Sequence, residues 1–256
     1  MSLRKSRKDL SLAPPRVALV VGGSGGIGRQ IVQELAPVCE KVFFTFQNGA
    51  EAAETLKREL ASPTTLIVPV QADLRDTSAW DQVLQQLVDE EEIDLLVNAA
   101  GVSVDGLCIE VTPDAFLEQY QVNVFAAWRA MSVIGRDMVF HRRGRIINIA
   151  SIAATLNSPG RSAYASTKAA LVSLTKSFAV ELGRFGVRVN AVSPGFVETD
   201  MIESFDEATR KRFTDQIPLG RFASASDVAR TVKYLATPDA AYLHGAVITV
   251  DGGTTA

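Results

Sequence analysis

The chain has 256 residues, of which 47% are hydrophobic and 21% charged, and its 26 basic and 29 acidic residues give a net charge of −3. This apolar content excludes disorder, and the balanced charge provides no field that would attract nucleic acid. The two cysteines and two histidines are too few for a disulfide framework or a zinc site, so we expect no metal.

The N-terminal segment is expected to be a flexible arm, residues 1–15, ahead of one catalytic domain, residues 16–256. Its basic residues Arg4, Lys5, Arg7 and Lys8 are not followed by the apolar segment that a signal peptide requires. No stretch approaches the roughly 20 apolar residues that cross a bilayer. A solvated arm is favoured over a phosphate-binding tail, and the chain is predicted to be cytoplasmic.

Short, nearly continuous apolar runs alternate along the chain with segments of helical periodicity. Such runs are typical of strands buried on both faces, as in a parallel sheet covered by helices. The pattern predicts an α/β fold: one doubly wound domain with a parallel sheet of about seven strands and helices on both faces. The expected strands are 17–21, 42–46, 66–70, 93–97, 146–149, 187–192 and 247–250, and the expected helices are 27–36, 50–60, 78–92 and 163–185.

One long irregular stretch, residues 194–225, contains a short amphipathic segment at 203–213. Long loops in compact domains are commonly functional. We expect the amphipathic segment to be a mobile lid over a site.

A glycine-rich turn, residues 22–28 (GGSGGIG), separates the first expected strand from the first expected helix. It fits the pattern GxxxGxG at positions 22, 26 and 28, and GxGxxG at positions 23, 25 and 28. Glycines permit a tight turn and let the backbone approach a pyrophosphate at the positive end of the helix. Nucleotide binding is therefore favoured over a purely structural turn.

The end of the second strand bears on the choice of cofactor. An acidic residue that binds the adenosine ribose of NAD should stand there, but the chain has Phe46 and Gln47, with no carboxylate before Glu51. The missing carboxylate favours NADP(H) over NAD(H), although the turn has no basic residue for the 2′-phosphate.

Tyr164 and Lys168 lie four residues apart on an expected helix, so both point to one face. A nearby cation lowers the pKa of a phenol from its ordinary value of about 10, which makes Tyr164 a usable general acid or base. Alone, the pattern is more typical of an amphipathic Tyr and a surface Lys.

Other polar residues change that interpretation. Ser151 and the segment 98–101 follow expected strands at their carboxyl ends, where ligands bind in open α/β sheets. Asn123 stands among apolar residues within a helix, either as a buried side chain bonded to backbone or as part of a polar relay.

Together these residues resemble the short-chain dehydrogenase/reductase family from Arg16 to Gly253, which implies a Rossmann-type fold and NAD(P)-dependent oxidoreduction. Val21 and Ala99 depart from the family's usual Thr and Asn. The resemblance implies the catalytic residues Asn123, Ser151, Tyr164 and Lys168. It also implies a cofactor site formed by Gly22, Ser24, Gly25, Gly26, Ile27, Gly28, Phe46, Gln47, Asp73, Leu74, Asn98, Ala99, Ala100, Gly101, Tyr164, Lys168, Pro194, Gly195, Val197 and Thr199.

The mechanism implied by the resemblance is ketone reduction. NADPH delivers a hydride to the carbonyl carbon, while Ser151 and Tyr164 donate hydrogen bonds to the oxygen, where charge develops. Tyr164 gives its proton, Lys168 lowers the pKa of Tyr164 and holds the nicotinamide ribose, and Asn123 positions a water. His141 and His244 match no catalytic position.

Within the family, the chain most resembles 3-oxoacyl-[acyl-carrier-protein] reductases, which implies a 3-oxoacyl thioester as substrate. Sugar, steroid and other secondary-alcohol dehydrogenases share the same motifs and stay as alternatives. Arg136, Arg142 and Arg143 could contact an acyl carrier protein, or form a solvated helix end. Phe185 occupies a second carrier-contact position and disfavours docking.

The family also implies a homotetramer formed through the helix 163–185 and the helix before it, with residues 246–250 near a second interface. In the helix 163–185, Ala169, Ala170 and Val180 extend beyond the face needed to cover a sheet. A protein of another class, a non-catalytic dinucleotide sensor, would need the glycine turn but not Ser151, Tyr164 and Lys168 together.

Overall fold

The computed structural model describes residues 13–199 and 206–256. Within these ranges seven parallel strands form the main sheet, in the order β3-β2-β1-β4-β5-β6-β9. The sequence order reverses between β1 and β4, as in a doubly wound sheet, so the predicted α/β fold is confirmed. The strands are β1 (Val17–Val21), β2 (Lys41–Phe46), β3 (Leu66–Gln71), β4 (Leu95–Asn98), β5 (Gly144–Ile149), β6 (Val187–Pro194) and β9 (Val247–Val250).

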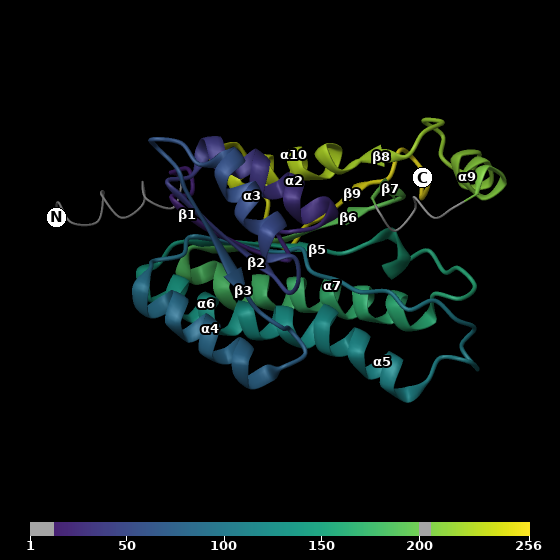
Figure 1. The fold of residues 1–256 in the computed structure, drawn as a ribbon, viewed down its shortest axis with the longest axis horizontal. Coiled ribbons are helices and arrows are strands. Elements are labelled where there is room, and N and C mark those ends of the chain that lie inside the picture. The colour runs from purple at the N-terminus through teal and green to yellow at the C-terminus, as the bar shows by residue number, and fades with distance from the viewer. Residues whose placement is uncertain (1–12, 200–205) are drawn as a thin grey trace.

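Helices cover both faces of the sheet (Figure 1). One layer contains α2 (Gly26–Leu35), α3 (Ala50–Leu60) and α10 (Ala225–Ala236). The other contains α4 (Thr77–Glu90), α6 (Ala126–His141) and α7 (Ser162–Leu182), with α5 (Pro113–Tyr120) at its end. Short helical turns are η1 (Ala36–Val38), the π-helical η2 (Gln121–Phe125), η3 (Ile152–Ala154), η4 (Gly183–Phe185) and η5 (Pro238–Ala240).

The apolar runs exist because each strand is buried on both faces. In β1, Ala18 and Val20 belong to the core under α2 and α10, whereas Val17, Leu19 and Val21 belong to the core under α4 and α6. All five side chains are buried, which leaves no place for the polar alternation of a half-exposed strand.

Some boundaries differ from those expected. The strand expected at 93–97 begins at Leu95 and ends at Asn98. The carboxylate of Asp94, just before it, accepts the backbone N–H groups of Arg16 and Val17. The helix expected to reach Phe185 ends at Leu182 and continues as η4. The sequence analysis had not delimited α5, α6 or α10.

The stretch 194–225 is less irregular than expected. It contains the short strands β7 (Val197–Glu198) and β8 (Ala223–Ser224), which pair with each other, and α9 (Glu207–Thr214). The first residues of the expected lid, 203–205, lie outside the described residues, as does most of the expected N-terminal arm. None of the described helices is long and apolar enough to span a membrane.

Because the strands are parallel, their carboxyl ends share one edge of the sheet. The segments that leave this edge after β1, β4, β5 and β6 begin with Gly22, Ala99, Ala150 and Gly195, respectively. The fold therefore gathers the motifs of the sequence analysis at one edge.

Candidate active site

The glycine turn between β1 and α2 cannot accept side chains at Gly22, Gly23 and Gly28; a Cβ on Gly23 would lie 2.6 Å from the Cβ of Phe44. Gly22 has a φ of +80°, and a Cβ there would lie 2.6 Å from the Cα of Ala100. A Cβ on Gly28 would lie 2.0 Å from the carbonyl oxygen of Gly22. By contrast, a Cβ on Gly25 would meet nothing within 4 Å. The turn is thus tight toward the protein and open outward.

The amino end of α2 suits a bound pyrophosphate. Gly25 is its N-cap, and no side chain of the described residues caps the helix or places a carboxylate in its first turn. The N–H groups of Gly26, Ile27 and Gly28 at this end carry the positive pole of the helix dipole. Ser24 lies within the turn, and the Thr199 methyl group lies 3.3 Å from a Cβ built on Gly26. These residues fit the dinucleotide that the sequence predicts.

The ends of β2 and β3 hold the residues expected at the adenosine. Phe46 is buried in the core, and Gln47 is exposed beside a cavity of about 460 Å³ that Asp73 and Arg75 also line. The carboxylate of Asp73 accepts hydrogen bonds from the Arg75 side chain at 2.8 and 3.0 Å, which lower its pKa to about 2. Leu74 is half-buried and accepts a hydrogen bond from Gln121 at its carbonyl oxygen.

Tyr164 and Lys168 lie in the first two turns of α7, close to Ser151 after β5. Burial raises the pKa of Tyr164, and this effect outweighs the lowering by a hydrogen bond with Ser151 and by the charge of Arg161. The ammonium of Lys168 lies 5.6 Å from the Tyr164 ring centre and donates to the carbonyl oxygen of Ile149 at 2.9 Å. Burial lowers the pKa of Lys168 to about 8. The sequence analysis expected a lowered pKa for Tyr164; burial reverses the direction.

Asn123 lies in the π-helical turn η2 between α5 and α6, and its buried side chain is bonded to backbone, as one of the two interpretations expected. Its Oδ1 accepts the N–H of Val102 at 2.8 Å, and its Nδ2 donates to the Val102 carbonyl oxygen at 2.9 Å. The same Nδ2 donates to the Thr167 hydroxyl at 3.0 Å, one residue before Lys168. Asn123 therefore joins the loop after β4 to α7. Single π-helical turns inside helices are frequent at functional sites.

The loops after β4 and β6 complete the edge. The N–H of Ala99 donates to the Val21 carbonyl oxygen, and a Cβ on Gly101 would lie 3.2 Å from the Lys168 ammonium nitrogen. Asn98 donates to Asn148 at 2.8 Å, while its Oδ1 is buried without a partner among the described residues. Pro194 ends β6, Gly195 donates to the carbonyl oxygen of Val250, and Val197 lies in β7.

Arg161 and Asp105 are two neighbours of Tyr164 that the sequence analysis missed. The guanidinium carbon of Arg161 lies 5.8 Å from the Tyr164 ring centre, and its Nε lies 3.2 Å from Asp105 Oδ2. The available signal was an arginine three residues before the tyrosine, nearly one helical turn away. The sequence around Asp105 gave no signal, because Asp105 lies far from Tyr164 in the chain and only the fold brings it close.

The arginines expected to contact a carrier protein are not brought to this edge. Arg142 caps the end of α6 and Arg143 follows it, both ahead of the first residue of β5, whereas Ser151 follows the last. The six residues of β5 span about 20 Å at roughly 3.3 Å each. Arg143 is also paired with Glu92 at 2.8 Å, while Arg136 is exposed on α6.

The two histidines have structural surroundings. His244 Nε2 lies 2.8 Å from the Ala179 carbonyl oxygen, and its Nδ1 accepts the N–H of Val189. His141 lies within 3.4 Å of an Asp137 carboxylate oxygen. Neither lies at the carboxyl edge of the sheet.

Comparison with known proteins agrees with this geometry. Residues 22–255 match a family model described as enoyl-(acyl carrier protein) reductase. A 3-oxoacyl-[acyl-carrier-protein] reductase of Pseudomonas aeruginosa is 36% identical over 93% of this chain and 96% of its own. The corresponding enzyme of Escherichia coli is 34% identical over the same shares.

Solved structures give the same result. A structure assigned provisionally as an NAD(P)-dependent gluconate 5-dehydrogenase of Beutenbergia cavernae, with NADP bound at low occupancy, matches with a TM-score of 0.90. It is 34% identical and covers 95% of this chain and 98% of its own. A dehydrogenase/reductase of Sinorhizobium meliloti, 35% identical, matches with a TM-score of 0.87 over 99% of this chain and 100% of its own. The chain is an NAD(P)-dependent oxidoreductase that acts on CH–OH and C=O groups, and it belongs to the short-chain dehydrogenase/reductase family.

Proposed function

We propose that this chain reduces a ketone to a secondary alcohol with NADPH. The observation that carries the proposal is the meeting of Tyr164, Ser151 and Lys168 at the carboxyl edge of the sheet, beside the uncapped amino end of α2. NADPH, when bound, supplies the hydride. The rest of the chemistry is done by side chains of this chain.

Tyr164 acts as the proton donor. Burial keeps its pKa above the ordinary value, so the hydroxyl is protonated at neutral pH and ready to donate as charge develops on the substrate oxygen. Ser151 donates a second hydrogen bond to that oxygen. Lys168 presents a positive charge to the nicotinamide ribose, and Asn123 fixes the Thr167–Lys168 turn and positions a water that returns protons to Lys168.

The preference for NADP(H) over NAD(H) belongs to this proposal. Its support is the absence of a carboxylate at the end of β2, where Phe46 is buried and Gln47 exposed. Asp73 lies at the next strand, but Arg75 neutralises it through two hydrogen bonds. A 2′-phosphate at this place would therefore meet little negative charge.

For the substrate we propose a 3-oxoacyl thioester, on the names of the curated relatives. The carrier-bound form rests on those names alone, because Arg142 and Arg143 stand at the opposite edge of the sheet. A second candidate is dehydrogenation of a sugar acid or another secondary alcohol. It is favoured by the cation of Arg161 beside Tyr164 and by the likeness to a gluconate dehydrogenase.

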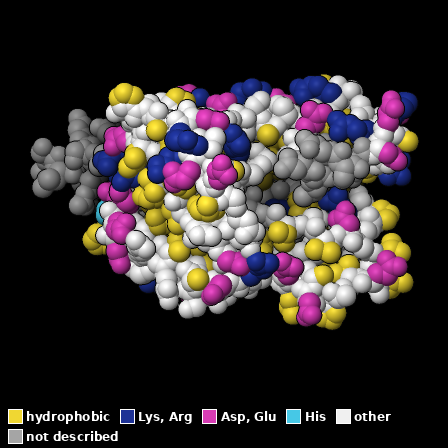
Figure 2. Space-filling view, in the orientation of Figure 1, with side chains coloured by type: hydrophobic (Ala, Val, Ile, Leu, Met, Phe, Trp, Pro, Cys, Tyr) yellow, Lys and Arg dark blue, Asp and Glu magenta, His cyan; other side chains and the backbone are white. Residues whose placement is uncertain are grey.

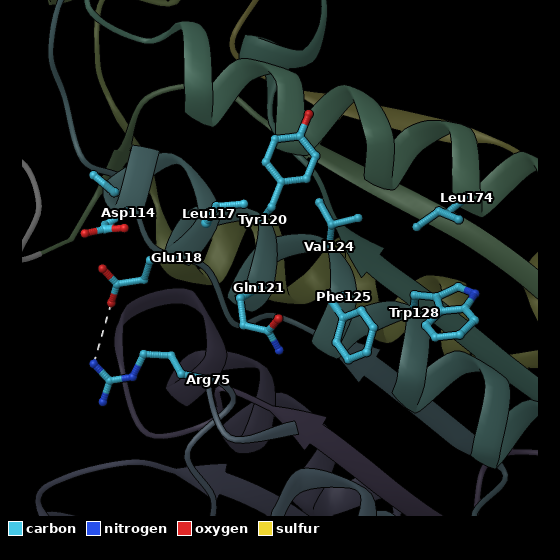
Figure 3. Close-up of a pocket in the computed structure, with 11 residues that line it drawn as sticks. Arg75, Asp114, Leu117, Glu118, Tyr120, Gln121, Val124, Phe125, Trp128 and Leu174 are labelled. Atoms are coloured by element: carbon cyan, nitrogen blue, oxygen red, sulfur yellow. Dashed lines mark ion pairs between the residues drawn. The ribbon is translucent and has the colours of Figure 1, made fainter. Parts of the chain in front are cut away.

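We further propose a homotetramer with an interface at α5, η2 and α6. A groove of about 1110 Å³ on this surface is lined by Leu117, Val124, Phe125, Trp128 and Leu174, with Arg75 and Glu118 paired at its rim (Figure 3). Leu117 is 62% and Trp128 37% exposed. Hydrophobic side chains are exposed at the α5 end of the molecule, with acidic side chains among them (Figure 2). Exposed apolar patches of this kind mark protein interfaces, and the groove includes Leu174 of α7, the helix for which the sequence predicts a partner copy.

A cytoplasmic location completes the proposal. Cys39 and Cys108 are both unpaired, as is usual in a reducing compartment.

The proposed activity is tested with a panel of 3-oxoacyl thioesters, sugar acids and simple ketones, each monitored by NADPH and NADH absorbance. Reduction of 3-oxoacyl compounds with NADPH is expected. Cofactor binding without turnover of any carbonyl compound would instead support the alternative of a non-catalytic sensor.

A further inference from the structure

A fixed positive charge stands beside the proposed proton donor. Arg161 lies at the N-cap of α7, three residues before Tyr164, and its guanidinium carbon is 5.8 Å from the centre of the phenol ring. Its side chain is 27% exposed, so it is largely enclosed but still accessible to a bound molecule. Lys168 is the other cation near this ring, but it is buried and directed to the carbonyl oxygen of Ile149.

The backbone around Arg161 fixes its position. The N–H of Gly106, in the loop after β4, donates to the carbonyl oxygen of Gly160 at 2.9 Å. This contact joins the loop after β4 to the segment just before α7, so two segments far apart in the sequence hold the backbone beside Arg161.

Asp105 forms an ion pair with Arg161. Its Oδ2 lies 3.2 Å from Nε, and the Asp105 side chain is 57% exposed. Asp105 Oδ1 accepts the Ser103 hydroxyl at 2.9 Å. Among the described residues, none accepts a hydrogen bond from the two terminal nitrogens of Arg161. An exposed ion pair contributes little stability. A carboxylate of a bound ligand can therefore approach the two terminal nitrogens, even if the Asp105–Arg161 pair is weakened.

We propose that Arg161 binds a carboxylate on the substrate, so that this chain also reduces free 3-oxo acids, with a higher kcat/KM than for the corresponding esters and thioesters. Arginine is suited to this role because its planar fork of N–H donors matches a carboxylate. The ketone then lies at Tyr164 and Ser151, and the carboxylate lies at the terminal nitrogens of Arg161. The short separation of Arg161 from the phenol ring limits the acid to one whose carboxylate is a few bonds from the ketone.

This inference rests on the proposed ketone reduction, and the reduction of 3-oxobutanoate transfers the same hydride and proton. The ketone carbon accepts a hydride, a proton with two electrons, from NADPH, which is released as NADP⁺. The carbonyl oxygen takes the hydroxyl proton of Tyr164, and solvent restores that proton. The product is 3-hydroxybutanoate. A thioester or ester masks the carboxylate and loses the contact with Arg161.

The test compares 3-oxobutanoate with its methyl ester at saturating NADPH. We expect the wild type to prefer the acid, and Arg161→Met to lower kcat/KM for the acid about 10- to 100-fold, mainly through KM. The same variant also removes a charge that lowers the Tyr164 pKa, which affects the acid and the ester alike. The readout is therefore the ratio of kcat/KM for the acid to that for the ester, which should fall about 10- to 100-fold, because the ester has no carboxylate for Arg161 to bind. For Arg161→Lys, kcat/KM for the acid should lie between the values of wild type and Arg161→Met, because lysine keeps the charge but lacks the planar fork of N–H donors. Asp105→Asn should raise the preference for the acid by removing a competing carboxylate.

A binding measurement separates this inference from the proposed function. The ligand 3-methylbutanoate keeps the carboxylate and has no ketone, and its Kd is measured by calorimetry with the NADPH complex. Its affinity should fall at least about 10-fold in Arg161→Met and stay unchanged in the control Arg58→Met, an exposed arginine on α3.

Equal affinity of 3-methylbutanoate for wild type and Arg161→Met, with no preference for the acid over the ester, would overturn the inference while leaving ketone reduction intact. Loss of binding in Arg161→Met without turnover of any ketone would support the anion site and overturn the proposed reduction. If Arg161→Met does not fold, Arg161→Lys and Asp105→Asn decide the question by moving the acid-to-ester ratio in opposite directions.

Discussion

The ammonium of Lys168 donates a hydrogen bond to the carbonyl oxygen of Ile149 at 2.9 Å, and this bond connects the second turn of α7 to the last residue of β5. Ser151 follows Ile149 by two residues, and Tyr164 precedes Lys168 by one helical turn. This one bond therefore fixes the distance between the two elements that carry the proposed hydrogen-bond donors. It also holds a positive charge in the interior, where Lys168 is 3% exposed.

The buried charge of Lys168 predicts a conflict between stability and function. Its pKa is about 8 in the folded chain and 10.5 as the reference value, so the unfolded state binds more protons between these two values. Below pH 8 the buried charge costs stability, and this cost disappears as the pH rises toward 10.5. Lys168→Met should therefore be more stable than wild type at pH 7 by about 1 to 3 kcal/mol, and lose this advantage near pH 10.

Urea unfolding at pH 7 and pH 10 measures this difference. Lys176→Met, on the exposed side of the same helix, is the matched control and should change stability by less than about 0.5 kcal/mol at either pH. The proposed cost of the buried charge would be contradicted if Lys168→Met were less stable than wild type at pH 7. It would also be contradicted if the variant changed the free energy of unfolding by the same amount at both pH values.

The same pKa predicts how cofactor affinity depends on pH. Lys168 loses its charge as the pH rises through about 8, so the proposed contact with the nicotinamide ribose should weaken above that value. The Kd for NADPH, measured by fluorescence between pH 6 and pH 10, should rise in wild type and stay nearly constant in Lys168→Arg, whose charge persists. A wild-type Kd that does not depend on pH would argue against this contact.

The end of β2 predicts a switch in cofactor preference. Phe46→Asp introduces a carboxylate that can accept hydrogen bonds from a ribose 2′-OH and repel a 2′-phosphate, so the ratio of NADP⁺ to NAD⁺ affinity should fall. Because Phe46 is buried, Phe46→Ala is the control for loss of the ring without a new charge. If wild type already binds NAD⁺ more tightly than NADP⁺, the interpretation of the missing acid is wrong.

The groove over η2 and α6 predicts an assembly that a single charge disrupts. Wild type should sediment as a tetramer at micromolar concentration, and Trp128→Glu should dissociate it, because a carboxylate cannot be buried unpaired in an apolar interface. Tyr242→Glu changes a fully exposed side chain away from the groove and should leave sedimentation unchanged. A monomeric wild type would refute the proposed interface.

The sequence predicted the sheet well because its strands are apolar on both faces, a pattern that does not depend on distant residues. Val17–Val21 shows this directly, since its alternate side chains enter two different cores. The sequence also predicted that the site lies at the carboxyl edge of the sheet, because Gly22 and Ser151 each come just after a strand.

Other features depend on contacts between distant segments and could not be predicted from local patterns. The π-helical turn at Gln121–Phe125 surrounds Asn123, whose side chain is held by Val102. The position of Arg161 is fixed by the Gly106–Gly160 contact between loops. The raised pKa of Tyr164 is a consequence of burial, whereas spacing alone indicates only a nearby lysine.

The central claim is that the Tyr164 hydroxyl supplies the proton in ketone reduction. Tyr164→Phe removes that hydroxyl and keeps the ring, so helix packing and NADPH affinity should be preserved. We expect kcat for the best ketone substrate to fall at least about 100-fold, the range of general acid catalysis, with the NADPH Kd within about 3-fold of wild type. Turnover by Tyr164→Phe near the wild-type rate, at equal NADPH occupancy, would contradict the account.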